Sequence, residues 1–525
     1  MALLDAPHLK ALHEHGKGDA WHIDSICRRL DLNDPWSFHA GRTVYRKAET
    51  KDEELVVPAP HLFTSLSSSS VSGSPDAVVL PSVAQCAVHL ELLEVFFKLR
   101  SDILHSTALE TTFGIKQSHR TVYQRVYGKP IRQPVKLKDP MWDEKRRKKW
   151  PYFLTLAVAR FEIWAEKAAA TLVGEKEEAV QLPYLPPLDI LMVWHAFLLN
   201  PKAFESYCNG PGRDLSRLRQ IPFPWKEIHD AIDTRHLTFT LPAPSAAWFS
   251  TTLSLSPDLF AFLTLTSTKP TNHPILAATT RFGTHGIPFR PSNNNNNTAP
   301  PPPPPPSDPS NDAQESAAFL SLLHTSRVHH QRQAPLADNV QRQAAFVDKM
   351  HRFLWLRAPS LAGTLRRAVA RYDRFLALFA LYRGEMLVPT LDIDLVWHTH
   401  QLSAGKYERD MLRRVGRFIN HDDTVGQGTL RGGRERTREV WRVRVGGEYE
   451  VCLCWDCEAI VDVLEEMEDG DKEQRGEGEE EEGEYWFEKV MQRVRNEVEY
   501  YRAVEAARRW KWERLPVRVK AWGEQ

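Results

Sequence analysis

The 525-residue sequence predicts a mainly α-helical protein built from two related helical repeats. The first observation is a duplication: LTLAVARFEIW, around Ala157, is followed by LDILMVWHAFLL, and LRRAVARYDRF, around Ala368, is followed by LDIDLVWHTHQL. Blocks that recur in the same order indicate duplicated architecture. The second observation is helical spacing of the apolar residues in these blocks. The third is that no convincing set of alternating strands is found. Each repeat should therefore be centred on an LD-x(4)-WH helix.

The motif helix should begin at Pro187 in the first copy and at Thr390 in the second, because both residues suit the start of a helix. Asp189 and Asp392 then fall in the first turn, where an acid interacts favourably with the helix dipole. Nearly every other position of the first copy is apolar, so this helix should be buried. Further helices are predicted over 81–102, 337–356 and 485–512.

Low-complexity segments divide the chain. Four of them are expected to be loops or disordered insertions: Ser65–Ser74, Asn293–Asn297 with Pro300–Pro306, Arg431–Arg438, and Glu465–Glu484. The expected organisation is a partly disordered N-terminal segment (1–75), a first repeat (76–240), a linker region with the Asn/Pro tract (241–334), a second repeat with a cysteine cluster (335–464), an acidic disordered insertion (465–484) and a charged, aromatic C-terminal helix (485–525).

Composition excludes some classes of protein. Lys plus Arg and Asp plus Glu both number 68, which argues against nucleic-acid binding by the whole surface. No stretch reaches the ~18 apolar residues of a membrane helix, so no membrane insertion is expected. The first 15 residues have no apolar core of a secretory signal, and six cysteines do not form a disulfide framework. We expect a reducing compartment, the cytoplasm, with the nucleus as the alternative.

The strings LDIDLVWHTHQL and LDILMVWHAFLL, with HDDT at 421–424, resemble the glycine-rich domain-containing protein-like (GRDP-like) family of plants and fungi. CLCWDCE at 452–458 is similar to the fungal branch. The resemblance implies a helical domain of little-known biochemistry. In the family, some plant members carry a putative RNA-binding segment and a glycine-rich tail. This chain has only 26 glycines and no such tail, so roles attached to the tail are not carried over.

The second motif copy carries the candidate catalytic residues Asp394, His398 and His400. Asp394 lies four residues before His398, so the two share a helix face. The first copy has Leu191 in place of Asp394. The functional interpretation is a polar pocket whose residues bind a metal or act in acid–base chemistry. The structural interpretation, which we favour from sequence, is that the motif histidines are buried and hydrogen-bonded.

Two other patterns concern metals. Some fungal members of the family are described as dioxygenases, which need two histidines and a carboxylate. His421-Asp422-Asp423 and His22-Ile23-Asp24 fit part of the His-x-Asp pattern, yet neither lies in a jelly-roll pattern. Cys452, Cys454 and Cys457 are candidate Zn²⁺ ligands, with His421 or Cys208 as the fourth. The alternative is that these cysteines act as small buried hydrophobes.

Three hypotheses of function follow. The favoured one is a non-enzymatic scaffold or regulatory protein with an unknown protein partner, in which His195 and His398 are enclosed without an open polar pocket. The second is a metal-dependent, oxygenase-like enzyme of the second repeat, which requires a cleft lined by three or more ligand-type side chains, with His421 a further candidate. The third is an RNA-associated protein that uses the basic run 145–149 and the C-terminal helix.

Overall fold

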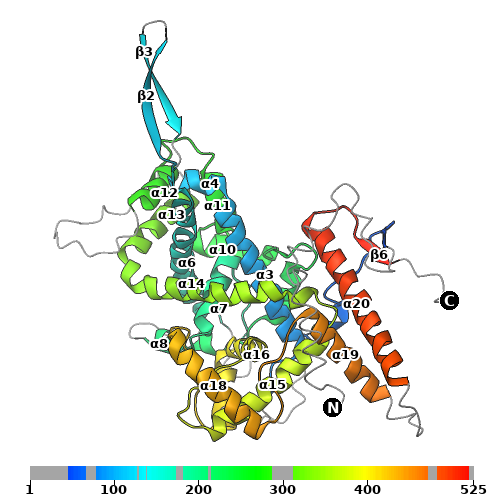
Figure 1. Ribbon diagram of the computed structural model, residues 1–525. Coiled ribbons are helices and arrows are strands. Elements are labelled where there is room, and N and C mark those ends of the chain that lie inside the picture. The colour runs from blue at the N-terminus through cyan, green and yellow to red at the C-terminus, as the bar shows by residue number, and fades with distance from the viewer. Residues whose placement is uncertain are drawn as a thin grey trace.

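The computed structural model describes residues 45–66, 79–126, 129–136, 139–172, 181–210, 215–285, 311–470 and 482–518. The fold is mainly helical, as predicted (Figure 1). The helices of the first half are α3 (Val83–His105), α4 (Thr107–Thr112), α5 (Trp142–Arg147), α6 (Lys149–Thr171), α7 (Leu188–Leu198), α8 (Pro201–Cys208), α9 (Trp225–Ala231), α10 (Ala243–Leu253), α11 (Leu259–Thr266) and α12 (Pro274–His285). Those of the second half are α13 (Asn311–Val328), α14 (His330–Phe353), α15 (Leu361–Leu381), α16 (Leu391–Gln401), α17 (Ala404–Val415), α18 (Gln427–Arg444), α19 (Trp455–Gly470) and α20 (Glu482–Arg509).

Three short antiparallel pairs of strands accompany the helices. They are β1 (Tyr45–Lys47) with β6 (Pro516–Arg518), β2 (His119–Val126) with β3 (Lys129–Lys136), and β4 (Ile232–Asp233) with β5 (Thr238–Phe239). The β2–β3 hairpin projects from the helical body, and β1–β6 brings residues from opposite ends of the chain together (Figure 1). The sequence did not predict these strands. In β2 and β3 polar residues and two prolines replace the alternation that marks a half-buried strand.

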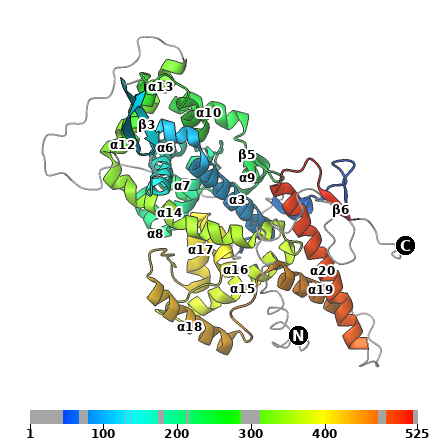
Figure 2. The same cartoon turned by 45° about the horizontal axis from the view of Figure 1, so that its top comes forward.

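The two repeats cross over and share one hydrophobic core. Helix α3 of the first half packs against α15 and α16 of the second, whereas α14 of the second half packs against α6 and α7 of the first. Helices α3 and α14 also pack on each other at the centre (Figure 2). Buried side chains from Phe63 to Tyr449 form one continuous core. The two repeats therefore pack together, because each motif helix needs cover from the other half of the chain.

Several expected boundaries differ from the structure. The stretch 241–334, expected to be a linker, forms α10, α11, α12, α13 and the start of α14 over its described part. The Gly/Arg-rich stretch 431–438, expected to be a loop or disordered, lies inside α18, where buried Val440 and Trp441 anchor the helix to the core. The Asn/Pro tract, the whole segment before Tyr45, all but the first two residues of the Ser-rich stretch 65–74, and much of the acidic insertion lie outside the described residues.

Candidate metal site in the second repeat

Each motif helix is fixed at its start by a buried ion pair to the helix before it. Arg160 of α6 donates to Asp189 of α7 at 2.7 Å, and Arg371 of α15 donates to Asp392 of α16 at 2.6 Å. The acids do lie in the first turn, as predicted. The sequence predicted that these acids interact with the helix dipole. It did not predict their arginine partners, although both arginines end the string AVAR, which occurs in both repeated blocks.

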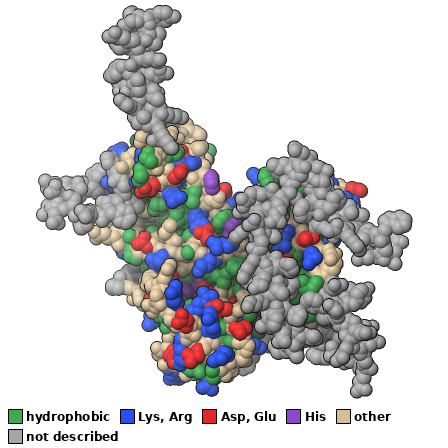
Figure 3. All heavy atoms as spheres, viewed as in Figure 1, with side chains coloured by type: hydrophobic (Ala, Val, Ile, Leu, Met, Phe, Trp, Pro, Cys, Tyr) green, Lys and Arg blue, Asp and Glu red, His purple; other side chains and the backbone are tan. Residues whose placement is uncertain are grey.

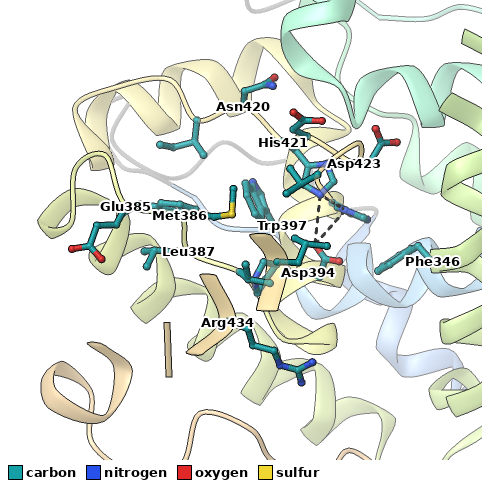
Figure 4. Close-up of a pocket in the computed structure, with 18 of the residues that line it drawn as sticks. Phe346, Glu385, Met386, Leu387, Asp394, Trp397, Asn420, His421, Asp423 and Arg434 are labelled. Carbon is teal, nitrogen blue, oxygen red and sulfur yellow. Dashed lines mark hydrogen bonds and ion pairs between the residues drawn. The ribbon is translucent and has the colours of Figure 1, made fainter. Parts of the chain in front are cut away.

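Asp394, His398 and His421 converge at one point. The Nε2 atoms of His398 and His421 lie 3.2 Å apart. Asp394 Oδ1 lies 3.3 Å from His398 Nε2 and 3.9 Å from His421 Nε2. Figure 4 shows Asp394 and His421 directed toward each other, with dashed lines meeting between them. Two residues of one helix face and one from a distant loop thus form a cluster of two imidazoles and one carboxylate.

The loop that carries His421 is held from both halves of the molecule. The Trp397 indole N–H donates to the Tyr407 hydroxyl at 2.9 Å, and that hydroxyl donates to the carbonyl of Ile419 at 2.8 Å. The backbone N–H of Lys202, in α8, donates to the Asn420 side chain at 3.2 Å. The Trp397 ring also meets the His421 ring edge-on at 5.2 Å. His421 is therefore positioned by contacts on either side of it.

Asp423, two residues beyond His421, takes a different part. Its carboxylate accepts from Asn339 at 3.1 Å and Gln343 at 3.2 Å, and it pairs with Arg342 at 3.1 Å. All three partners lie on α14. Asp423 therefore fastens the loop to α14, and the carboxylate that joins the two histidines is Asp394.

A cavity of about 1300 Å³ opens beside the cluster. Asp394, His398 and His421 all line it, together with aromatic and aliphatic side chains such as Phe346 and Trp397 (Figure 4). The His398 side chain is only 2% exposed, whereas Asp394 is 22% exposed and His421 14%. The cluster thus lies in the cavity wall, and His398 is its most deeply buried member.

Burial governs the electrostatics of this cluster. Burial raises the pKa of Asp394 to about 6, and it lowers the pKa of His398 well below its usual value. Asp394 Oδ1 is buried and accepts no hydrogen bond among the described residues. In the absence of a cation, burial therefore disfavours the charged form of both Asp394 and His398.

His400, the third candidate of the second motif, lies elsewhere. Its Nε2–H donates to Asp410 at 3.0 Å, and its Nδ1 accepts from the Tyr372 hydroxyl at 3.0 Å. Residues two apart on a helix point about 200° apart, so His398 and His400 cannot face the same point. Both His400 nitrogens are satisfied inside the core, and the geometry gives it a structural position.

His195, the equivalent residue of the first copy, is enclosed and contacts a histidine that sequence reasoning missed. The Thr399 hydroxyl donates to Leu395 C=O at 2.7 Å and so accepts from His89 Nδ1–H at 2.8 Å. His89 Nε2 must then accept from His195 Nε2–H at 2.9 Å. His89 therefore bridges α7 and α16. The only indication of this role in the sequence was that His89 lies in a mostly apolar stretch of α3.

The sulfur atoms of Cys452, Cys454 and Cys457 lie within 4.8 Å of one another. Neither His421 nor Cys208 joins them in the described part of the chain: His421 belongs to the cluster with Asp394, and Cys208 is buried in α8. His22 and Asp24 lie outside the described residues.

The basic run 145–149 is mostly engaged within the fold. Lys145 pairs with Asp139, Arg146 with Glu110, and Lys149 is buried against Glu110 and the carbonyl of Ser106. Basic and acidic side chains are intermixed over the lower part of the face shown in Figure 3. Over the described residues, no helix combines the length and the apolar character needed to cross a membrane.

Fold and site together define a helical protein with a duplicated motif and a cavity at the second copy. Residues 312–410 match the model of the glycine-rich domain-containing protein-like (GRDP-like) family, so the chain carries a GRDP-like domain. The match includes Asp394 and His398 but ends before His421.

Two curated relatives are similar to part of this chain. Glycine-rich domain-containing protein 1 of Arabidopsis thaliana is 42% identical over 93 residues, which cover 16% of this chain and 11% of the relative. Glycine-rich domain-containing protein 2 of Arabidopsis thaliana is 40% identical over 93 residues, which cover 16% of this chain and 12% of the relative. The chain thus matches only about a tenth of the length of these relatives. No solved structure shows a significant match.

Proposed function

We propose that Asp394, His398 and His421 bind one divalent transition metal, and that the adjoining cavity is the active site of a metal-dependent enzyme. The observation that carries the proposal is the convergence of three donor atoms in the wall of a cavity of about 1300 Å³. The second hypothesis drawn from the sequence required a cleft lined by at least three ligand-type side chains. The favoured scaffold hypothesis required enclosed histidines, and that condition is met at His195 but not beside His398.

The spacing suits a single ion. Two bonds of about 2.1 Å allow donor atoms to lie at most about 4.2 Å apart. The three separations, 3.2, 3.3 and 3.9 Å, all fall within that limit. A proton shared between the two Nε2 atoms would leave Asp394 Oδ1 without a partner. One cation satisfies all three lone pairs at once, which is why a metal suits this arrangement better than hydrogen bonds alone.

Three protein ligands leave coordination positions open, as in catalytic rather than structural metal sites. Two imidazoles and one carboxylate suit Zn²⁺, Fe²⁺, Mn²⁺ or Co²⁺. The open positions are on the cavity side, where Asp394 and His421 are partly exposed. A metal there would activate a bound water molecule or polarise a substrate oxygen.

The cavity favours a small organic anion as substrate. Lys202, Lys349, Arg417 and Arg431 line it, and none of them pairs with a carboxylate among the described side chains. Phe346 and Trp397 add apolar surface beside the metal ligands. Cations without a counterion around a concave site raise the local concentration of anions.

Metal analysis of the purified full-length protein tests the proposal. We expect close to one equivalent of zinc, iron, manganese or cobalt at this site, measured as the difference between the wild type and each of His398→Ala, His421→Ala and Asp394→Asn. Asp422→Asn is the matched control: Asp422 is the adjacent, exposed carboxylate of the same loop, it accepts hydrogen bonds from Thr424, and its variant should keep the metal. Absence of metal after reconstitution with each of the four ions would overturn the proposal, as would its retention in all three ligand variants.

The metal found directs the search for activity. Zinc would favour hydrolysis of an anionic ester or amide, and iron would favour chemistry with dioxygen. In either case Lys349→Glu should weaken anion binding to the metal-loaded protein without removing the metal. Isothermal titration with small carboxylates and phosphates would measure this loss, and equal binding by the variant would exclude Lys349 from substrate binding.

A further inference from the structure

A second cluster of metal-type ligands lies at the N-terminus of α19. Cys452 is half-buried, whereas Cys454 is 6% and Cys457 5% exposed. All three sulfur atoms lie within 4.8 Å of one another, and the spacing is Cys-x-Cys-x-x-Cys. A cysteine that acts only as a small hydrophobe needs no sulfur neighbour, so the gathering of three calls for a separate explanation.

Burial raises the pKa of Cys454, and a hydrogen bond with Cys452 raises the pKa of Cys457, so thiolates here need a bound cation to offset their charge. Cys454 immediately precedes α19, and its sulfur accepts the backbone N–H of Cys457 at 3.4 Å. Backbone N–H groups at the start of a helix favour anions, and hydrogen bonds to ligand atoms orient them around a metal. Asp456, between Cys454 and Cys457 in sequence, pairs with Arg502 of α20 and so adds no free carboxylate to the cluster.

We propose that Cys452, Cys454 and Cys457 bind a zinc ion as thiolates, with a water molecule as the fourth ligand on the half-buried Cys452 side, and that this ion stabilises the fold although the protein leaves one coordination position to water. Bonds of about 2.3 Å in a tetrahedron bring sulfur atoms to about 3.8 Å from one another. The observed spacing requires only small side-chain rotations to reach this geometry. Within the described ranges no other histidine, cysteine or carboxylate joins the group, which is why the fourth ligand is assigned to water.

The zinc ion would fasten the α19–α20 pair to the helical body. The Trp355 indole donates to Leu453 C=O at 2.8 Å, and the Trp455 indole donates to Phe353 C=O at 2.8 Å. These bonds tie the cysteine loop to the end of α14. Beyond it, buried side chains of α19 and α20 form a second, smaller core together with Leu354 and Ala358, which lie between α14 and α15. The proposed zinc site, which we call the zinc clip, lies at the base of the α19–α20 pair, where the chain leaves the main core.

The two metal proposals share no ligand and can fail separately. Cobalt substitution of the full-length protein distinguishes them, because thiolate ligands give sulfur-to-cobalt charge-transfer absorption in the near ultraviolet and imidazole or carboxylate ligands do not. We expect this absorption in the wild type and in His398→Ala. In Cys452→Ser, both this absorption and one equivalent of metal should be lost. Cys208→Ser is the matched control, because Cys208 is buried and isolated from other sulfur atoms, and it should keep the absorption.

Two results would overturn the zinc clip. One is a wild type without thiolate-to-cobalt absorption. The other is a thiol titration of the denatured, metal-free protein that finds two fewer free thiols than its six cysteines, because that would show a disulfide within the cluster. The wild-type spectrum does not depend on any variant folding. Zinc removal should also speed proteolytic cleavage between α19 and α20 severalfold, and an unchanged cleavage rate would refute the fastening role.

Discussion

The two copies of the motif helix share a framework and differ in what surrounds the histidine. Both begin with a buried Arg–Asp pair, and in both the motif tryptophan packs against an aromatic residue of the preceding helix. Beside His195 there is a space of only about 20 Å³, whereas His398 faces a cavity of about 1300 Å³. The shared framework can therefore form without a metal-ligand cluster beside it. The second copy differs from the first because it has Asp394 where the first has Leu191, and because a loop brings His421 to it.

The shared ion pair should have the largest effect. Asp189→Ala would leave Arg160, 1% exposed, as a buried charge without its partner. We expect a loss of about 3–5 kcal/mol in the free energy of unfolding. Asp392→Ala should cost less, because Arg371 keeps Tyr449 C=O and the Thr390 hydroxyl as partners. Urea denaturation measures both, and equal costs would show that these extra partners contribute nothing.

Giving the first copy the carboxylate of the second should damage it. Leu191 is completely buried. Leu191→Asp should destabilise the protein by about 3 kcal/mol, because the new carboxyl group would be buried without a cation or a hydrogen-bond donor. It should not create a second metal site: His89 does face His195, but it is completely buried between Thr399 and His195, and the space beside His195 is only about 20 Å³. Metal analysis together with denaturation checks this, and a gain of one metal equivalent would show that the new carboxylate forms a site with His195 and His89.

Giving the second copy the phenylalanine of the first should affect stability but not metal. His400→Phe removes the partner of the Tyr372 hydroxyl and one of the two partners of Asp410, which keeps Lys406, at a cost of about 2 kcal/mol. Adding Asp410→Tyr, which copies Tyr207 of the first repeat, should recover part of that loss. Metal content should equal that of the wild type in both variants; a fall in metal content would place His400 among the residues that position the site.

The most gradual effect concerns pH, because it is spread over several pH units. Burial lowers the pKa of His195 to about 3, whereas an unfolded histidine titrates near 6.5. Between these values the unfolded state binds more protons, so stability is present above about pH 6.5 and falls as pH drops toward 3, by at most ~1.4 kcal/mol per unit. His195→Gln, which can still donate to His89, should show a shallower decline. Parallel curves for the two proteins would contradict this cause.

The sequence predicted the helices best where apolar periodicity is strong. Both motif helices begin one residue after the expected starts, with Pro187 and Thr390 as their N-caps, and α3 and α20 lie within a few residues of their predicted ranges. It was wrong about Arg431–Arg438, because glycines and arginines suggested a loop while Val440 and Trp441, further along, anchor a helix. The hairpin β2–β3 was missed because it stands away from the core and lacks the burial pattern that identifies strands.

The candidate site was predicted only in part. The spacing of Asp394 and His398 indicated a shared helix face, which the structure confirms. The approach of His421 could not be derived, because it depends on the path of a loop fixed by Tyr407 and by α8 from the other half of the chain. Grouping His400 with His398 ignored the 100° rotation per residue of a helix.

Because α3 and α14 cross between the two halves, neither half of this chain covers its own apolar surface. A cut between residues 285 and 311 would separate two fragments, each exposing apolar grooves that the other normally fills. Such fragments should aggregate when produced alone and reassemble when produced together. The protein could thus serve as a split reporter, in which recovery of a folded complex records that the two pieces have met.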